Sequence, residues 1–222
     1  PDLYTFLYKD LIGSKVIITI HNFIKEDLYD LYPFYKAFIY DKIWSYVLKK
    51  NSHLVMSTNQ IKKYYNDLFR NEIEYKIISY GVPKINSENI YDKKLDNLKK
   101  TYTIIGSAGS LINIKGFQQL IYFLKDNKDF AVVICGEGPK KDFLLKLAEE
   151  NNVSDRFVLL GFKNNVTSYY KYFDIYAMTS YSEGFGLAML EAITSGLPLV
   201  SSNLEIYKSF FSDENVGLFE LD

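Results

Sequence analysis

The residues with the clearest chemical potential lie between Ser180 and Ala192, in the order Ser-Tyr-Ser-Glu-Gly-Phe-Gly-Leu-Ala-Met-Leu-Glu-Ala. An expected strand over 174–178 precedes the two glycines and a helical pattern follows them, which predicts a change from strand to turn to helix. The first amides of a helix lack an intrahelical partner and carry partial positive charge, so a phosphate group can bind there. Gly184 and Gly186 let the backbone approach such a ligand closely.

Two glutamates lie eight residues apart around this turn. Glu183 precedes the helix, where a carboxylate can meet a sugar or its developing positive charge. Glu191 lies on the helix, from which it can reach back to a pair of ribose hydroxyls. The ordinary alternative makes Ser182 or Glu183 a helix cap and Glu191 a solvated residue. The strand, glycine turn and helix around the two glutamates favour a ligand site over that alternative.

The elements that must position these residues alternate between strand and helix. Strands are expected near 102–106, 130–135, 157–160, 174–178 and 198–201, and helices near 116–125, 139–151, 164–171, 186–195 and 204–211. Such alternation indicates βαβ units and a parallel sheet. The short apolar runs over 131–134 and 157–160 are typical of strands covered on both faces. The fold class is therefore α/β, with a Rossmann-like domain at 102–222.

The segment before residue 84 also reads as α/β but supplies only about three strands. Its strands are expected at 15–20, 53–56 and 76–80, with one helix from Pro33 and another capped by Ser57 that runs through Phe69. We interpret 1–83 as a partial N-terminal domain. The polar stretch 84–101 lacks periodic apolar residues and is predicted to be a linker.

Several motifs resemble those of the retaining GT-B glycosyltransferases of family four, also called glycosyltransferase group 1. The run 180–192 followed by Gly-Leu-Pro at 196–198 is similar to the family's donor-site signature. Four further segments of this sequence, 109–116, 134–139, 160–162 and 203–205, resemble other loops of the family and occur in the family's order. The resemblance covers 103–222, and it is weaker at 18–22 and 79–83.

The resemblance implies a GT-B-like fold that transfers a sugar, with retention, from a nucleoside-diphosphate sugar to a glycan or glycolipid acceptor. Lys115 and the helix amides would hold the diphosphate, and Glu191 would orient the ribose. Glu183 and His21 would be the catalytic residues, with His21 facing the donor from the N-terminal domain. The implied donor-binding residues are Ser110, Lys115, Gly136, Phe162, Gly184, Phe185, Gly186, Leu187 and Glu191.

Two departures from the family pattern bear on activity. Ser110 stands where the family usually has an arginine that neutralises the donor pyrophosphate, and a neutral hydrogen bond is weaker than a charged one. Tyr80 replaces the usual asparagine. The family's first strands and closing helices are not in the sequence, so we expect a truncated chain. A nucleotide-binding but catalytically idle partner subunit and a GT-B-type sugar-nucleotide epimerase remain as alternatives.

Composition excludes several other classes. With 26 basic and 27 acidic residues the net charge is -1, which is not that of a nucleic-acid binder. No cysteine, histidine or carboxylate cluster has metal-site spacing, so we expect neither a metal nor a cofactor beyond the donor. The single cysteine, Cys135, is expected in the core and fits a reducing, cytoplasmic compartment. The helix from Pro33, with Trp44 and Tyr46, leaves peripheral contact with the inner face of a membrane open beside ordinary core packing.

Overall fold

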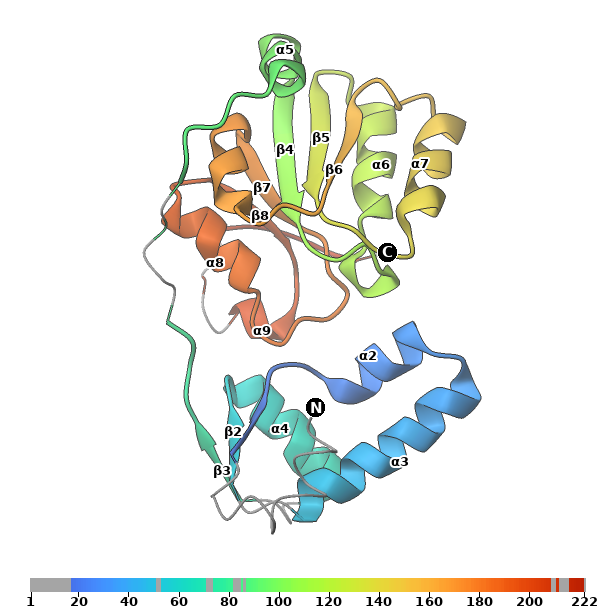
Figure 1. Ribbon diagram of the computed structural model, residues 1–222, viewed down its shortest axis with the longest axis vertical. Coiled ribbons are helices and arrows are strands. Elements are labelled where there is room, and N and C mark those ends of the chain that lie inside the picture. The colour runs from blue at the N-terminus through green and yellow to red at the C-terminus, as the bar shows by residue number, and fades with distance from the viewer. Residues whose placement is uncertain are drawn as a thin grey trace. The chain divides into compact units, whose positions relative to one another are not determined.

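The computed structural model describes residues 17–50, 53–70, 74–81, 85, 87–208, 211 and 216–221. The chain divides into two compact units (Figure 1). The first unit comprises Pro1–Gly81 together with the short segment Ser182–Phe185, and the second comprises Val82–Tyr181 and Gly186–Asp222.

The first unit has a small parallel sheet with helices between its strands. The strands are β1 (Ile18–Ile20), β2 (Leu54–Met56) and β3 (Tyr75–Ile77), in that spatial order, and the helices are α2 (Ile24–Leu31), α3 (Phe34–Lys50) and α4 (Asn59–Phe69). Buried side chains of β1, β2, α3 and α4 form its core. The first two residues of the strand predicted at 15–20 lie outside the described residues. Helix α2 was not predicted, because only Leu28 of its eight residues is buried.

The cap of α4 differs from the prediction by one residue. Thr58, not Ser57, is the N-cap, and its Oγ1 accepts a hydrogen bond of 3.2 Å from the amide of Ile61. The side chain of Ser57 is fully buried instead. Neighbouring hydroxyl residues offer the same capping chemistry, so the sequence alone does not choose between them.

The second unit has a sheet of parallel strands in the order β6-β5-β4-β7-β8-β9. The strands are β4 (Thr103–Ala108), β5 (Phe130–Cys135), β6 (Phe157–Gly161), β7 (Ile175–Met178), β8 (Leu199–Ser202) and β9 (Gly217–Phe219). This is the doubly wound Rossmann order, in which the chain reverses direction across the sheet between β4 and β7. The helical elements are α5 (Lys93–Thr101), η1 (Asn113–Lys115), α6 (Gln118–Asp126), α7 (Lys141–Glu150), η2 (Val166–Tyr172), α8 (Leu187–Thr194) and α9 (Glu205–Lys208).

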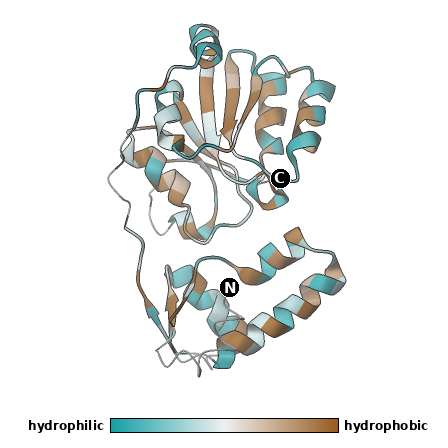
Figure 2. Cartoon of the chain, viewed as in Figure 1, coloured by the Kyte–Doolittle hydropathy of each residue, from teal (hydrophilic) through white to brown (hydrophobic). Residues whose placement is uncertain are grey.

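Both faces of this sheet are buried, as the apolar runs predicted. Val132 and Ile134 of β5 pack into a core with α6 and α7, while Ala131 and Val133 pack into a second core with α5, η2 and α8. The strands accordingly stand out as hydrophobic, whereas the covering helices show hydrophilic residues as well (Figure 2). The expected helix at 164–171 is a 3₁₀ helix, η2. Within the expected helix at 204–211 the structure has α9, and residues 209 and 210 lie outside the described residues.

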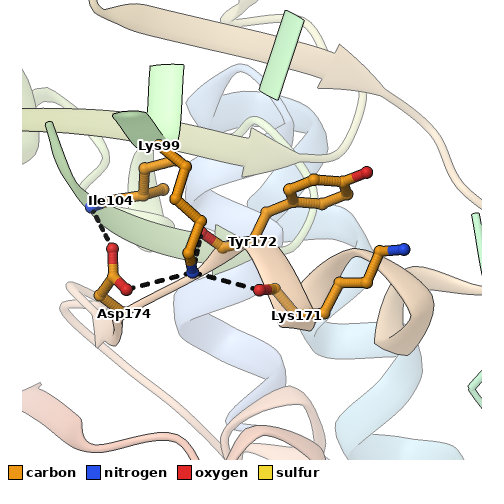
Figure 3. Close-up of polar contacts among 5 residues, drawn as sticks. All are labelled: Lys99, Ile104, Lys171, Tyr172 and Asp174. Carbon is orange, nitrogen blue, oxygen red and sulfur yellow. Dashed lines mark hydrogen bonds and ion pairs between the residues drawn. The ribbon is translucent and has the colours of Figure 1, made fainter. Parts of the chain in front are cut away.

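The second half of the predicted linker is a helix instead. Leu95 and Leu98 of α5 are buried in the core of the second unit. Lys99 Nζ lies 3.1 Å from the Asp174 carboxylate and donates to the carbonyl oxygens of Lys171 and Tyr172, also at 3.1 Å. The same carboxylate accepts a 2.9 Å hydrogen bond from the amide of Ile104 (Figure 3). These contacts fix α5 to the starts of β4 and β7.

Candidate functional site

The sheet of the second unit brings several predicted site residues to one edge. Gly136 and Phe162 directly follow β5 and β6, and Ser110 lies two residues after the end of β4. In a parallel sheet the carboxyl ends of the strands share an edge. Ligands of such folds bind outside these ends, where the strand order reverses, here between β4 and β7. The topology therefore predicts a ligand site beside the loops that follow β4 and β7.

A pocket of about 280 Å³ lies at this edge. Its walls come from the ends of β4, β5 and β6 and from α8, and the lining residues are Ala108, Gly109, Ser110, Cys135, Gly136, Glu137, Phe162, Lys163, Val166 and Ala188. Three predicted donor-binding residues, Ser110, Gly136 and Phe162, thus lie together. The Phe162 side chain is 71% exposed, which leaves the ring free to stack on a planar ligand.

Lys163 is a pocket residue that the sequence analysis missed. Its Nζ lies 5.3 Å from the centre of the Tyr169 ring, and it lines the pocket together with Ser110. Burial raises the pKa of the Cys135 thiol to about 12, against a smaller opposing effect of the Lys163 charge, so the thiol stays protonated. Lys163 therefore supplies a cation to the pocket that Ser110 also lines.

Glycine at position 136 allows two loops to pack backbone to backbone. The amide of Gly109 donates a hydrogen bond to the Cys135 carbonyl oxygen, and the amide of Gly136 donates one to the Gly161 carbonyl oxygen, both at 3.0 Å. A Cβ atom at Gly136 would overlap the carbonyl oxygen of Gly109. Any larger residue would displace the loop that carries Ser110.

The loop with Lys115 is fastened to the end of β7. Thr179 Oγ1 donates a 2.7 Å hydrogen bond to the carbonyl oxygen of Lys115, and the amide of Tyr181 donates to that of Ile114 at 2.8 Å. Gly116 has φ 62°, and a Cβ atom there would collide with the Thr179 carbonyl oxygen. The Lys115 side chain runs beside Gly109, with its Cε 3.7 Å from where a Cβ of Gly109 would lie. Lys115 thus lies where the strand order reverses.

Helix α8 begins with a glycine that its backbone requires. Gly186 is the N-cap and has φ 83°, in the left-handed region that other residues avoid. No side chain in the described part of the chain caps this end, and the first turn holds no acidic residue. Leu187, the first helical residue, is 46% exposed. The start of α8 therefore retains unpaired amides and partial positive charge, as predicted for an anion site.

Glu191 lies one turn further along α8 in a partly desolvated position. Burial raises the pKa of its carboxyl group above the ordinary value, and its charge contributes to the raised pKa of Tyr170. Within the described ranges, no residue donates a hydrogen bond or forms an ion pair with this carboxylate. A carboxylate that is partly buried without a protein partner is poised for ligand hydroxyls.

The remaining predicted residues belong to the first unit. The exposed ring of His21 stacks on Tyr80, with the ring centres 5.4 Å apart and the planes at 20°. Tyr80 also meets Phe185 edge-on at 4.9 Å. A Cβ atom at Gly184 would overlap the His21 carbonyl oxygen, so glycine is required there too. His21, Gly184 and Phe185 therefore lie together, with the half-buried Glu183 in the same segment.

Two absences concern the described residues alone. There, no three His, Cys, Asp or Glu side chains gather closely enough to bind a metal ion. None of the helices in those ranges combines the length and the apolar character needed to cross a bilayer.

Comparison with known families gives a match over most of the second unit. The family model described as "Glycosyl transferases group 1" matches residues 90–220. The O-antigen biosynthesis glycosyltransferase WclY of Escherichia coli is 28% identical over 219 residues, which are 95% of this chain and 61% of WclY. The chain thus spans less than two thirds of the length of this relative.

Solved structures show the same fold. HepE of Anabaena, determined in complex with UDP and glucose, matches 99% of this chain and 61% of its own with a TM-score of 0.77 at 14% identity. The pneumococcal O-GlcNAc transferase GtfA, in complex with UDP and GlcNAc, matches 98% of this chain and 43% of its own with a TM-score of 0.67 at 20% identity. The predicted GT-B-like α/β fold with a Rossmann-like domain is confirmed.

Proposed function

Since the chain belongs to the group 1 glycosyltransferases, we propose that it carries out the retaining transfer of a sugar from a nucleoside-diphosphate donor to a glycan acceptor. One observation carries the proposal. The pocket after β4, β5 and β6 lies at the same sheet edge as Lys115, in the unit whose helix α8 starts with unpaired amides and presents Glu191.

The donor diphosphate binds Lys115 and the first amides of α8. Both groups supply positive charge before the reaction begins. The Lys115 loop is held in place by hydrogen bonds that the Thr179 hydroxyl and the Tyr181 amide donate to its carbonyl oxygens. As the bond between the anomeric carbon and the phosphate oxygen breaks, negative charge grows on the diphosphate. Positive groups fixed in advance stabilise that charge without reorganisation, which is a large contribution to catalysis.

The nucleoside occupies the pocket. Its base stacks on the exposed Phe162 ring, and its ribose hydroxyls donate hydrogen bonds to the Glu191 carboxylate. The hydroxyls replace the water that burial removes from this carboxylate, so binding offsets the desolvation that raises its pKa. Lys163 adds a second cation at the pocket wall, where it compensates for the arginine missing at Ser110.

Glu183 and His21 contact the transferred sugar. In the retaining reaction the acceptor oxygen attacks the anomeric carbon from the face that the diphosphate leaves. A phosphate oxygen of the departing diphosphate takes the acceptor's proton, so no separate general base is needed. Donor and acceptor identities rest on relatives: HepE and GtfA are complexes with UDP, and WclY is named for O-antigen biosynthesis.

A second candidate is a nucleotide-binding subunit that does not turn over its ligand. The specific observation in its favour is Ser110, which lines the pocket as a neutral residue at the place of the family's arginine. This candidate predicts nucleotide binding with no release of sugar.

Product analysis separates these functions. The chain is incubated with UDP-glucose or UDP-N-acetylglucosamine and an O-antigen oligosaccharide, and proton NMR follows the anomeric signals. The proposal predicts a new glycosidic bond with the donor's anomeric configuration. Inversion would refute the retaining reaction, an epimerised UDP-sugar would identify an epimerase, and bound UDP without product would favour the idle subunit.

A further inference from the structure

The backbone at His21 is fixed by its neighbours, whereas its side chain is not. His21 directly follows β1, and its carbonyl oxygen packs so closely on Gly184 that a Cβ atom there would overlap it. The next residue, Asn22, accepts a 3.2 Å hydrogen bond from the Tyr65 hydroxyl at its carbonyl oxygen. The imidazole ring is exposed, and within the described ranges neither of its nitrogens has a hydrogen-bond or ion-pair partner. The ring therefore needs another contact to keep one orientation.

The ring of Tyr80 supplies that contact. The centres of the His21 and Tyr80 rings are 5.4 Å apart and their planes are inclined by 20°, which is a stacked arrangement. The strands β1, β2 and β3 are parallel, so the residues that follow β1 and β3 leave the sheet at the same edge. Because β2 lies between β1 and β3, the two strands are roughly 9–10 Å apart, and only large side chains bridge that interval. The asparagine that is usual at position 80 in the family has no ring to stack.

Tyr80 is itself held in place by a buried ring. Phe185, which is 7% exposed, meets Tyr80 edge-on, with the ring centres 4.9 Å apart and the planes at 76°. Stacked and edge-on arrangements are the ones that aromatic rings prefer at such separations. Tyr80 is half-buried, so its ring has less freedom than the exposed ring of His21. The three rings thus form a row that runs from the buried Phe185 to the exposed His21.

We propose that Tyr80 is a positioning residue, whose ring orients the His21 imidazole toward the transferred sugar. The inference rests on the proposed function, in which His21 contacts that sugar. A stacked ring pair favours one side-chain orientation over the others about 2- to 12-fold. Donor affinity comes from the contacts with the diphosphate and the nucleoside, so loss of the stack lowers kcat and leaves KM nearly unchanged. The Tyr80 hydroxyl takes no part in the stack, so phenylalanine can replace tyrosine here, whereas leucine and asparagine cannot.

Proton NMR tests the stack independently of the reaction. The chain has two histidines, His21 and His53, so the imidazole signals are few and the variant His21→Ala assigns them. The spectra are recorded in alkaline buffer, in which imidazole rings are neutral. Protons over the face of an aromatic ring are shielded, so the His21 signals should move downfield in Tyr80→Leu and stay in place in Tyr80→Phe, with His53 as the internal reference. The matched control is Tyr40→Leu, which removes an edge-on contact with Tyr32 in the same unit and should leave the His21 signals in place.

Steady-state kinetics measures the effect of the stack on transfer, with the UDP-sugars and the O-antigen oligosaccharide as substrates. We expect Tyr80→Leu to lower kcat about 2- to 12-fold and to change the donor KM less than about twofold. Tyr80→Asn, which introduces the usual family residue, should behave like Tyr80→Leu, and Tyr80→Phe should keep the wild-type kcat. In a His21→Ala background Tyr80→Leu should cause no further loss, because a residue that acts through His21 then has nothing left to position.

The outcomes separate this inference from the proposed function. Circular dichroism establishes that each variant is folded, and Tyr80→Asn takes the place of Tyr80→Leu if the leucine variant does not fold. The inference is overturned if the His21 signals do not move in the folded variant, if kcat is unchanged, or if the loss of kcat is as large in the His21→Ala background. If the wild type transfers no sugar, the proposed function fails and the NMR series alone decides: a downfield shift supports the stack, and no shift overturns it.

Discussion

Replacement of Glu191 by glutamine should weaken nucleotide binding and stabilise the empty protein at the same time. A hydrogen bond to a charged acceptor contributes about 1.5–3 kcal/mol and a neutral one about 1 kcal/mol. Two ribose hydroxyls together then lose about 1–4 kcal/mol, which weakens UDP binding from about fivefold to several hundredfold. Calorimetric titration with UDP measures this loss, with Glu149→Gln on α7 as the control.

The stability effect has the opposite sign because burial raises the carboxyl pKa in the folded state. Below the ordinary pKa of 4.5 the group is protonated whether the chain is folded or not, so Glu191→Gln should leave the melting temperature unchanged. As the pH rises through the folded-state pKa, the wild type loses stability and the variant does not. A higher melting temperature for Glu191→Gln at pH 7 is therefore expected. Wild-type UDP affinity, or a lower melting temperature at pH 7, would refute the reasoning.

Three further substitutions test neighbouring parts of the site. Ser110→Arg should tighten UDP binding about 2- to 30-fold by calorimetry, because it replaces a neutral donor with a charged one; unchanged affinity would show that the diphosphate lies elsewhere. Thr179→Val removes the hydrogen bond to the Lys115 carbonyl oxygen and should cost about 1–2 kcal/mol of stability in urea unfolding, with weaker UDP binding. Asp174→Ala leaves the Ile104 amide unpaired and should cost about 1–2 kcal/mol while UDP affinity stays at the wild-type value.

Strong periodic segments were predictable from the sequence and weak ones were not. The run Ala131–Ile134 is apolar without interruption because both faces of the sheet are covered, and the structure confirms it as part of β5. Helix α5 was missed because only Leu95 and Leu98 break a charged sequence. Its start carried a usable signal, since Asp92 caps the amides of Lys94 and Leu95. Strand β9 has three residues, too few for any pattern.

The site was predictable where chemistry is local to a motif. Gly186 and Glu191 were found because strand, glycine turn and helix follow one another in the sequence. Lys163 was missed, because its position in the pocket with Ser110 follows from the parallel pairing of β4, β5 and β6, which places loops distant in sequence at one edge. The hydrogen bond from Thr179 to the Lys115 carbonyl oxygen likewise depends on the pairing of β4 with β7, which the sequence alone does not show.

The most direct test of nucleotide-sugar binding is calorimetric titration of the chain with UDP, GDP and ADP, alongside Lys115→Ala. Lys125→Ala, which changes an exposed lysine of α6, is the control. The account predicts that a nucleoside diphosphate binds, that Lys115→Ala weakens binding about 10- to 150-fold, and that the control binds as the wild type. A folded chain that binds none of the three nucleotides, or that binds equally well without Lys115, would contradict it.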